Sequence, residues 1–333
     1  MYDQPTESEA RAFIGSLGLR FEAGFDELVG LYENGQLVAC GARAGYVLKM
    51  LAIAPSHQGS GALGALVTRL ILSGLAAGHE TLFVFTLPQN VASFQALNFR
   101  LLAAHGTAAL LEHGPGLEVY LAAHAAQVTP GRNGAIVLNG NPFTLGHRHL
   151  VELAARQVDH LFVFVVSEDC STFPFAVRYA LAVEATAHLP RVTVLETSRY
   201  SVSAGTFPSY FLKRLEEADR AQMQVDLQLF ARRIAPAFHI ATRFVGQEPL
   251  CPTTAAYNRT MAEVLGGSAI QMLEVPRLEA GGAPVSASRV RAALAAGEFG
   301  GLERLVPPST LAFLRSPAAQ VIIESLRTPL KGA

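Results

Sequence analysis

The sequence has no tryptophan and only three cysteines, which are far apart and lack the Cys-x-x-Cys spacing of metal and redox sites. These cysteines are Cys40, Cys170 and Cys251. An odd number of scattered cysteines argues against a disulfide framework, so we expect small buried side chains in a reducing cytoplasm. The first ten residues are acidic and polar, without a basic segment and an apolar one, so no secretory signal is predicted.

Charge of either sign is also scarce. Charged residues make up 16% of the chain, and 26 basic against 27 acidic side chains leave a net charge of −1. Without a basic surface the chain cannot neutralise several phosphates, which excludes a general nucleic-acid binder. The longest uncharged apolar run, residues 101–111, is too short to cross a bilayer, so no membrane association is expected.

Lysine is nearly absent, because 23 of the 26 basic residues are arginine. The lysines are Lys49, Lys213 and Lys331. Codon or host bias is one explanation. The other is anion recognition, since the planar guanidinium group binds phosphate and carboxylate through two parallel hydrogen bonds.

Apolar side chains are abundant, at 50% of 333 residues. This length and composition predict about two domains, each with its own core. The segment at residues 129–134 is polar and rich in turn-forming residues, and the sequence changes character across it. We therefore place a first domain at residues 1–128 and a second at residues 134–333.

The first domain is predicted to be α+β. The Asn-Gly pair at residues 34–35 lies between two apolar segments, which predicts a β-hairpin. A strand at residues 46–53 leads into a glycine loop at residues 58–61, and helical periodicity follows. Further apolar strands are expected near residues 101–111 and 117–121.

In the second domain, short apolar strands alternate with helices. The strands are expected at residues 135–138, 161–166, 191–195, 237–245 and 269–273. Strands that are apolar on both sides predict a parallel sheet covered by helices on both faces, which is an α/β domain. Ligands of such sheets bind at the carboxyl ends of the strands.

The sharpest local pattern lies where the first of these strands ends and a helix begins. Gly140 allows a tight turn, Gly146 allows close approach of a ligand, and His147 falls in the first helical turn. Free N–H groups and the helix dipole favour anions at that position. The pattern predicts a phosphate site that holds a proton-carrying side chain.

The Thr-x-Gly-His pattern from Thr144 to His147 resembles the (H/T)xGH signature of the nucleotidyltransferase superfamily, which transfers a nucleotidyl group from a nucleoside triphosphate with loss of pyrophosphate. Residues 285–291 are similar to a second signature of that superfamily, IS(S/T)TxxR, at a helix start. Blocks at residues 171–178, 203–211 and 246–258 resemble the citrate lyase ligase family. The resemblance covers essentially the whole chain.

The resemblance implies a GNAT-like (acetyltransferase-like) α+β domain followed by a Rossmann-like, parallel-sheet nucleotidyltransferase domain. The glycine loop is similar to the pyrophosphate loop of GNAT proteins, although Leu63 stands where a small residue is expected. This implies a site for coenzyme A or a pantetheine group, or a docking module for a carrier protein. The sequence identifies no general base for amine acetylation; His57 is nearby, and it also fits a solvated loop residue. The loop residues implied are Gln58, Gly59, Ser60 and Gly61.

The family reaction implied by the resemblance uses ATP, acetate and the prosthetic-group thiol of the citrate lyase acyl carrier protein, and it forms the acetyl thioester, AMP and pyrophosphate. Acetate first forms acetyl adenylate, and the thiol then takes the acetyl group. Since carboxylate is a weak nucleophile, the protein is expected to act by positioning and charge stabilisation. Mg²⁺ is expected to bridge phosphate oxygens, because it needs few protein ligands.

The resemblance also implies roles for side chains. His147 is expected to donate a hydrogen bond and to act as acid to the leaving group, with Thr144 as a second donor. The family pattern has lysine where Leu145 stands, and Arg148 is the candidate substitute. Arg178 and Arg199 are candidates for binding acetate or phosphate. The expected nucleotide- and phosphate-binding residues are Asn139, Gly140, Asn141, Phe143, Gly146, Gly246, Glu248, Ser286, Ser288 and Arg291.

Three alternatives stay open. The chain resembles a plain adenylyltransferase equally well at residues 144–147 and 285–291, and such an enzyme attaches AMP to a phosphate-bearing metabolite. A GNAT acetyltransferase that binds coenzyme A is a second alternative. The third is a carrier-protein binding module without enzymatic activity, which would neither bind nor turn over ATP.

Overall fold

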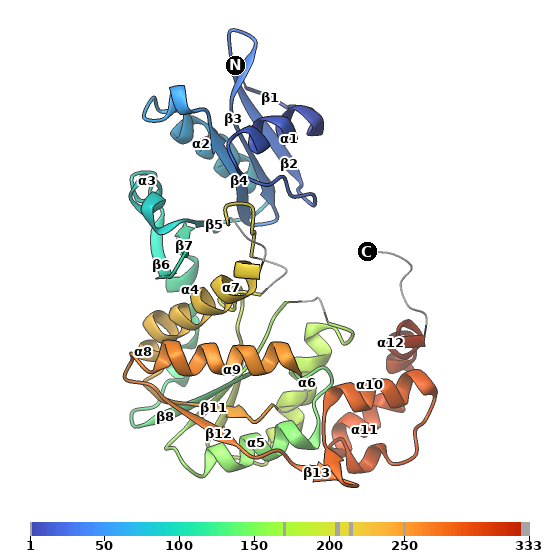
Figure 1. The fold of residues 1–333 in the computed structure, drawn as a ribbon. Helices are drawn as coiled ribbons and strands as arrows, with labels where there is room; N and C mark the ends of the chain where they lie inside the picture. The colour runs from blue at the N-terminus through green and yellow to red at the C-terminus, as the bar shows by residue number, and fades with distance from the viewer. Residues whose placement is uncertain (1, 169–170, 204–206, 213–215, 249–250, 328–333) are drawn as a thin grey trace. The chain divides into compact units, whose positions relative to one another are not determined.

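The computed structural model describes residues 2–168, 171–203, 207–212, 216–248 and 251–327, and the chain divides into two compact units (Figure 1). The first unit comprises Met1–Ala123 and Val202–Arg233, and the second comprises His124–Ser201 and Ile234–Ala333. Residues 202–233 belong to the first unit although they follow part of the second unit in the sequence. A single boundary near residues 129–134 therefore does not describe the division into units. Cys40 is buried, Cys251 is exposed, and both are free, whereas Cys170 lies outside the described residues.

The first unit is built on a mixed sheet with strand order β1-β2-β3-β4-β5-β7-β6. The strands are β1 Tyr2–Asp3, β2 Glu27–Glu33, β3 Gln36–Ala44, β4 Val47–Ile53, β5 Leu82–Thr86, β6 Arg100–His105 and β7 Ala108–His113. The helices are α1 Glu7–Ser16, α2 Ala62–Ala76, α3 Val91–Gln95 and α4 Gly116–His124. Helix α2 buries Leu66, Val67 and Leu70 in the core of this unit, as its helical periodicity predicts.

The predicted hairpin is confirmed, because Glu33 pairs with Gln36 and both turn residues, Asn34 and Gly35, have positive φ. The predicted strand at residues 117–121 is wrong, since these residues belong to α4. The buried Glu112 carboxylate accepts the Leu117 N–H at 3.1 Å and so satisfies a free donor of the first helical turn. A short apolar run fits a strand and a buried helix equally well, and this polar contact decides between them.

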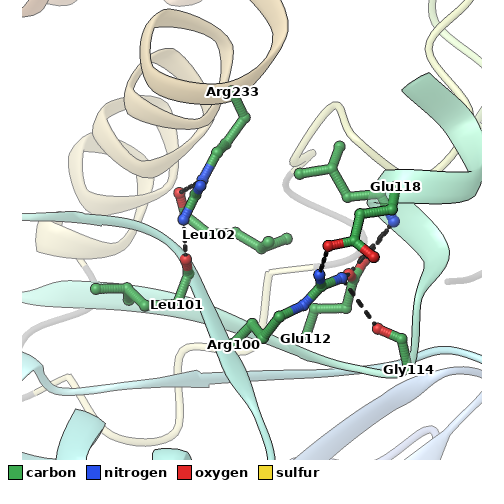
Figure 2. A network of polar contacts seen from close by, with 8 residues as sticks. Arg100, Leu101, Leu102, Glu112, Gly114, Glu118 and Arg233 are labelled. Atoms are coloured by element: carbon green, nitrogen blue, oxygen red, sulfur yellow. Dashed lines mark hydrogen bonds and ion pairs between the residues drawn. The ribbon is translucent and has the colours of Figure 1, made fainter. Parts of the chain in front are cut away.

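Strand β6 lies at the edge of the sheet, and helix α7, Glu216–Leu229, packs against it. The pairing of β6 with β7 is interrupted between Leu101 and Ala103. Arg233 follows α7 and donates to the carbonyls of Leu101 at 2.5 Å and Leu102 at 3.3 Å (Figure 2). An edge strand leaves carbonyls without strand partners, so the guanidinium protects this edge.

A second arginine, Arg100, ties β6 to the neighbouring elements (Figure 2). Its guanidinium pairs with the carboxylates of Glu112, at 3.0 Å, and Glu118, and it donates to the Gly114 carbonyl at 3.2 Å. Glu112 has no exposed surface, so this pairing compensates a buried charge. The start of α4 and the edge of the sheet are thereby fixed together.

The second unit contains a five-stranded parallel sheet with the order β10-β9-β8-β11-β12. The strands are β8 Asn133–Leu138, β9 Leu161–Val165, β10 Val192–Glu196, β11 Ile240–Gly246 and β12 Gln271–Val275. The helices are α5 Leu145–Ala155, α6 Phe175–Thr186, α8 Ala235–Ala237, α9 Pro252–Leu265, α10 Ala287–Ala296, α11 Pro308–Leu314 and α12 Pro317–Arg327. A short hairpin, β13 Glu279–Ala280 and β14 Ala283–Pro284, precedes α10.

The direction of strand succession reverses between β8 and β11, which makes this the switch point of the sheet. Right-handed crossovers that run in opposite directions place their helices on opposite faces, and α5 and α9 lie on opposite sides of the sheet in Figure 1. The predicted α/β class is confirmed, and β9 is buried along its whole length. Among the residues described, no helix has the length and apolarity that a bilayer span requires.

Candidate active site

A cavity of about 640 Å³ opens at the carboxyl ends of β8, β11 and β12, where the first turns of α5 and α10 also border it. This is the position at which parallel α/β sheets bind ligands. The cavity brings together most of the residues that the sequence assigned to the site. They are Asn139, Gly140, Asn141, Thr144, Gly146, His147, Gly246, Glu248, Ser286, Ser288 and Arg291.

The start of α5 fixes the orientation of the His147 ring. Thr144 is the N-cap residue, and its hydroxyl accepts the His147 N–H at 3.3 Å. In return, His147 Nδ1 accepts the Thr144 N–H at 3.0 Å, which completes a capping box. Because Nδ1 is an acceptor, the hydrogen of the neutral ring belongs on Nε2, which is the ring's donor atom.

The surroundings of His147 keep its ring neutral. Burial lowers the pKa of His147 to about 4, and the positive charge of Arg277 acts in the same direction. The ring also lies against Phe143, with 5.3 Å between the two ring centroids. At neutral pH, His147 is therefore a hydrogen-bond donor without a charge. An anion bound beside it would raise the pKa, because negative charge favours the protonated ring.

Gly146 allows two helix starts to approach each other. A Cβ atom at this position would lie 2.9 Å from the Val285 carbonyl oxygen, a backbone atom. Val285 directly precedes Ser286, the N-cap residue of α10. Gly146 lines the cavity, and it also has this role in packing, which its sequence context did not indicate.

Arg291 joins the two signature segments across the cavity. Its Nη1 donates to the Asn141 carbonyl at 2.5 Å, and its Nη2 donates to the Ser288 hydroxyl at 3.2 Å. Ser286 caps α10 by accepting the Arg289 N–H at 3.2 Å. Two helix starts thus border one cavity, and the positive end of the helix dipole at each start favours a ligand with several negative charges.

Arg277, two residues beyond β12, lines the cavity but was missed in the sequence. Its Nε donates to the Gln247 carbonyl at 2.5 Å, and its Nη2 forms an ion pair with Glu248. The other Glu248 oxygen accepts the Cys251 N–H at 3.1 Å. Residues just after parallel strands gather at the same edge of the sheet, so the position of Arg277 was the signal that could have found it.

Several predicted residues do not line the cavity. Arg178 has no exposed surface, and its guanidinium donates to carbonyls at the ends of β8 and β9 and to Asn139 Oδ1 at 2.7 Å. Arg148 pairs with Glu152 at 3.3 Å. Phe143 is buried behind the cavity wall, and Arg199 is exposed. Arg178 therefore positions Asn139, and contact of Arg199 with a substrate stays a prediction.

A second cavity, of about 1010 Å³, lies within the first unit. Strands β4 and β5 pair in parallel at Val47–Phe83 and Leu48–Val84. The cavity lies past these pairs, at the carboxyl ends of the two strands. Gln58, Gly59 and Gly61 of the glycine loop line it, together with Tyr210 and Phe211 of the segment at residues 202–233. Tyr210 is buried, and its hydroxyl accepts a hydrogen bond from the backbone of Leu51 on β4.

The remaining loop residues lie at the rim of this second cavity. Ser60 is outside its lining and donates its hydroxyl to the His57 carbonyl at 2.7 Å. The His57 ring lines the cavity and lies 2.5 Å from the Glu33 carboxylate, measured from Nε2. A hydrogen-bonding partner of this kind fixes the orientation of an imidazole ring.

Within the described part of the chain, no group of three or more His, Cys, Asp or Glu side chains has the arrangement of a metal site. Glu248 is the acidic side chain among the described residues that line the 640 Å³ cavity. A Mg²⁺ ion that is held by phosphates and water needs one or two carboxylates. Glu248 therefore fits a metal ion that arrives with a nucleotide.

The second unit is a parallel α/β domain with a neutral histidine, guanidinium groups and two helix starts around one cavity at the switch point of its sheet. Residues 133–314 match the family model described as the citrate lyase ligase C-terminal domain. The chain is 43% identical over 319 residues to the citrate pro-3S-lyase ligase of Klebsiella pneumoniae, covering 94% of this chain and 93% of that protein. The chain belongs to the citrate lyase ligase family.

Two solved structures are similar to parts of the chain. TmcAL of Thermotoga maritima, bound with alpha-thio ATP, is 12% identical with a TM-score of 0.39, over 55% of this chain and 55% of that chain. The ribosomal-protein-S18-alanine N-acetyltransferase of Escherichia coli is 16% identical with a TM-score of 0.28, over 34% of this chain and 92% of that chain.

Proposed function

We propose that the chain is an AMP-forming acid–thiol ligase. It activates acetate with ATP as acetyl adenylate and acetylates the prosthetic-group thiol of the citrate lyase acyl carrier protein. Membership of the citrate lyase ligase family supports the choice of partner. The observation that carries the nucleotide step is the 640 Å³ cavity, which unites His147 on α5 with Ser286, Ser288 and Arg291 on α10.

In the first step, an acetate oxygen attacks the α-phosphorus of ATP. The bond from this phosphorus to the bridging oxygen breaks, and pyrophosphate leaves with the negative charge. His147 Nε2–H donates a hydrogen bond to the phosphates, while Arg291 and the N–H groups of the α5 and α10 starts stabilise the developing charge. Once phosphate charge has raised its pKa, His147 can also supply a proton to pyrophosphate.

In the second step, the carrier-protein thiol loses its proton and attacks the acetyl carbon of the adenylate. The acyl–oxygen bond breaks and AMP leaves. Glu248 would hold a Mg²⁺ ion that binds with the nucleotide, and such an ion would supply further charge stabilisation. Positioning of the reactants, rather than a covalent enzyme intermediate, accounts for the acceleration.

The cavity of the first unit is proposed to take the pantetheine part of coenzyme A or of the carrier prosthetic group. Gly59 and Gly61 both have positive φ, which frees a loop backbone to approach a phosphate closely. Leu51, Ile53 and Leu97 add apolar surface to the lining, which suits the methyl and methylene groups of a pantetheine arm.

Acetate-dependent exchange between ATP and labelled pyrophosphate tests the ligase activity directly. The His147→Ala variant should lower this exchange by about 10² to 10³-fold, the cost of removing one preorganised donor. His149→Ala is the matched control, since His149 lies on the same helix but outside the cavity lining, and it should exchange like the wild type.

Other outcomes would identify the alternatives. Exchange that ignores acetate but requires a phosphate-bearing acceptor would indicate an adenylyltransferase. Acetylation of amines from acetyl coenzyme A without pyrophosphate release would indicate a GNAT acetyltransferase. Absence of ATP binding in a thermal-shift titration would indicate a carrier-binding module, because a ligand of the native state raises the unfolding midpoint.

A further inference from the structure

Arg277 occupies a fixed place beside the start of α10. In the hairpin before this helix, Glu279 pairs with Pro284, and the Val285 N–H donates to the Leu278 carbonyl at 2.9 Å. Continuing this antiparallel ladder by one residue places Arg277 opposite Ser286, and both line the 640 Å³ cavity. The hairpin that delivers the N-cap of α10 thus also delivers a guanidinium.

The guanidinium of Arg277 also acts across the cavity on the start of α5. Its positive charge is one of the two causes of the lowered pKa of His147, so the two groups lie within electrostatic reach of each other. Arg277, His147 and Ser286 all line the 640 Å³ cavity, so an anion bound in it lies in the field of the guanidinium and beside the α10 start and His147.

Glu248 neutralises Arg277 in the structure described here. The Glu248 side chain is 8% exposed and that of Arg277 is 23% exposed, so the pair is largely withdrawn from water. Either charge alone in this position would be costly. The carboxylate belongs to the loop after β11, whereas the guanidinium follows β12, so the pair spans two adjacent strand ends.

We propose that Arg277 is a polyphosphate-binding residue and that Glu248 is its resident counter-ion, which the phosphates of ATP replace as the partner of the guanidinium. This inference rests on the proposed function and specifies which arginine meets the leaving phosphates. A guanidinium binds a phosphate through two parallel hydrogen bonds, which a lysine cannot reproduce. Arg277 thereby supplies the cation that Leu145 does not, in place of Arg148, which pairs with Glu152.

Isothermal titration calorimetry of ATP, pyrophosphate and AMP, each without acetate, tests this assignment. Arg277→Ala should weaken binding of ATP and pyrophosphate by about 10- to 100-fold, the loss expected for hydrogen bonds to a charged group, and change AMP affinity less than about twofold. Arg277→Lys should lie between the wild type and the alanine variant. The control Arg148→Ala should bind all three like the wild type.

A fourth variant tests the counter-ion. Glu248→Gln removes the competing carboxylate, so pyrophosphate should bind several-fold more tightly in the absence of metal. Equal pyrophosphate affinity in the wild type and Arg277→Ala would overturn the phosphate role, as would an equal loss of AMP affinity. Unchanged affinity in Glu248→Gln would overturn the counter-ion role. A wild type that binds no ATP would instead refute the proposed function itself.

Discussion

Replacing Gly146 with alanine separates helix propensity from the geometry of the site. Gly146 is the second residue of α5 and has an ordinary helical conformation, with no positive φ. At such a position alanine normally stabilises a helix by up to about 1 kcal/mol. Any harm from Gly146→Ala must therefore come from the space that the new methyl group occupies.

That space is already taken by backbone. The Cβ atom would lie 2.9 Å from the Val285 carbonyl oxygen, whereas ordinary contact begins near 3.4 Å, so the two must separate by about 0.5 Å. Val285 is 4% exposed and bonded to Leu278, and it leads directly into Ser286. The start of α10 must therefore move away from α5, and overpacking of this kind costs about 1 to 3 kcal/mol.

We expect Gly146→Ala to lower acetate-dependent ATP–pyrophosphate exchange by about 10-fold, since a displacement of 1 Å can cost about 10². Gly15→Ala is the matched control, because its Cβ would meet no atom within 4 Å and it lies in α1 of the first unit. That variant should keep full exchange. Wild-type exchange in Gly146→Ala would refute the conclusion that the spacing of the two helix starts sets the geometry of the phosphate site.

Two further predictions concern His147 and Arg233. Because the pKa of His147 falls from 6.5 to about 4 on folding, the unfolded chain takes up the proton first as the pH drops, and the folded state loses stability. Relative to His147→Gln, the wild type should lose about 2 to 3 kcal/mol of unfolding free energy between pH 7 and pH 4, measured by urea unfolding; a constant difference would contradict the lowered pKa. Arg233→Met removes the donors to Leu101 and Leu102, so urea unfolding of the first unit should be easier by about 1 to 2 kcal/mol while exchange stays unchanged. Lost exchange in that variant would contradict a purely structural role.

Local chemistry made the start of α5 predictable from the sequence. An apolar strand, a glycine turn, a capping threonine and a helix follow one another between residues 133 and 155, and each is dictated by its own residues. The carboxyl ends of parallel strands then place the site at one edge of the sheet. The second signature, at residues 285–291, could be placed at a helix start in the same way, because Ser286 also caps a helix.

The origin of the first unit from two parts of the chain could not be predicted. The segment at residues 202–233 joins it through long-range contacts, such as the Ser209 N–H donating to Glu22 at 2.7 Å and the Arg20 N–H donating to the Tyr210 carbonyl at 3.1 Å. The residue pattern of α7 does not indicate whether this helix packs on the sheet of the second unit, whose residues flank it in the sequence, or on the sheet of the first unit. Tertiary partners decide such placements, and periodicity does not identify them.

Donation to backbone carbonyls is a structural explanation for the excess of arginine over lysine, in addition to codon bias and anion recognition. Arg178, Arg233 and Arg289 each donate to two or more backbone carbonyls. A guanidinium carries five N–H donors in a fixed plane, whereas an ammonium carries three around one point. Arginine can therefore satisfy several carbonyls at strand and loop ends at once.

Arg178→Lys tests this use where the side chain is most enclosed. Its guanidinium donates to the carbonyls of Phe173, Asn139, Val166 and Glu168 at 2.7 to 2.9 Å, with no exposed surface. A lysine keeps the charge but leaves at least one carbonyl unpaired, at about 1 to 3 kcal/mol each, so unfolding of the second unit should be easier by about 2 to 4 kcal/mol. Exchange should also fall, because Asn139 lines the cavity. The exposed control Arg156→Lys should shift stability by no more than about 0.5 kcal/mol, and an equally small shift in Arg178→Lys would show that charge alone suffices there.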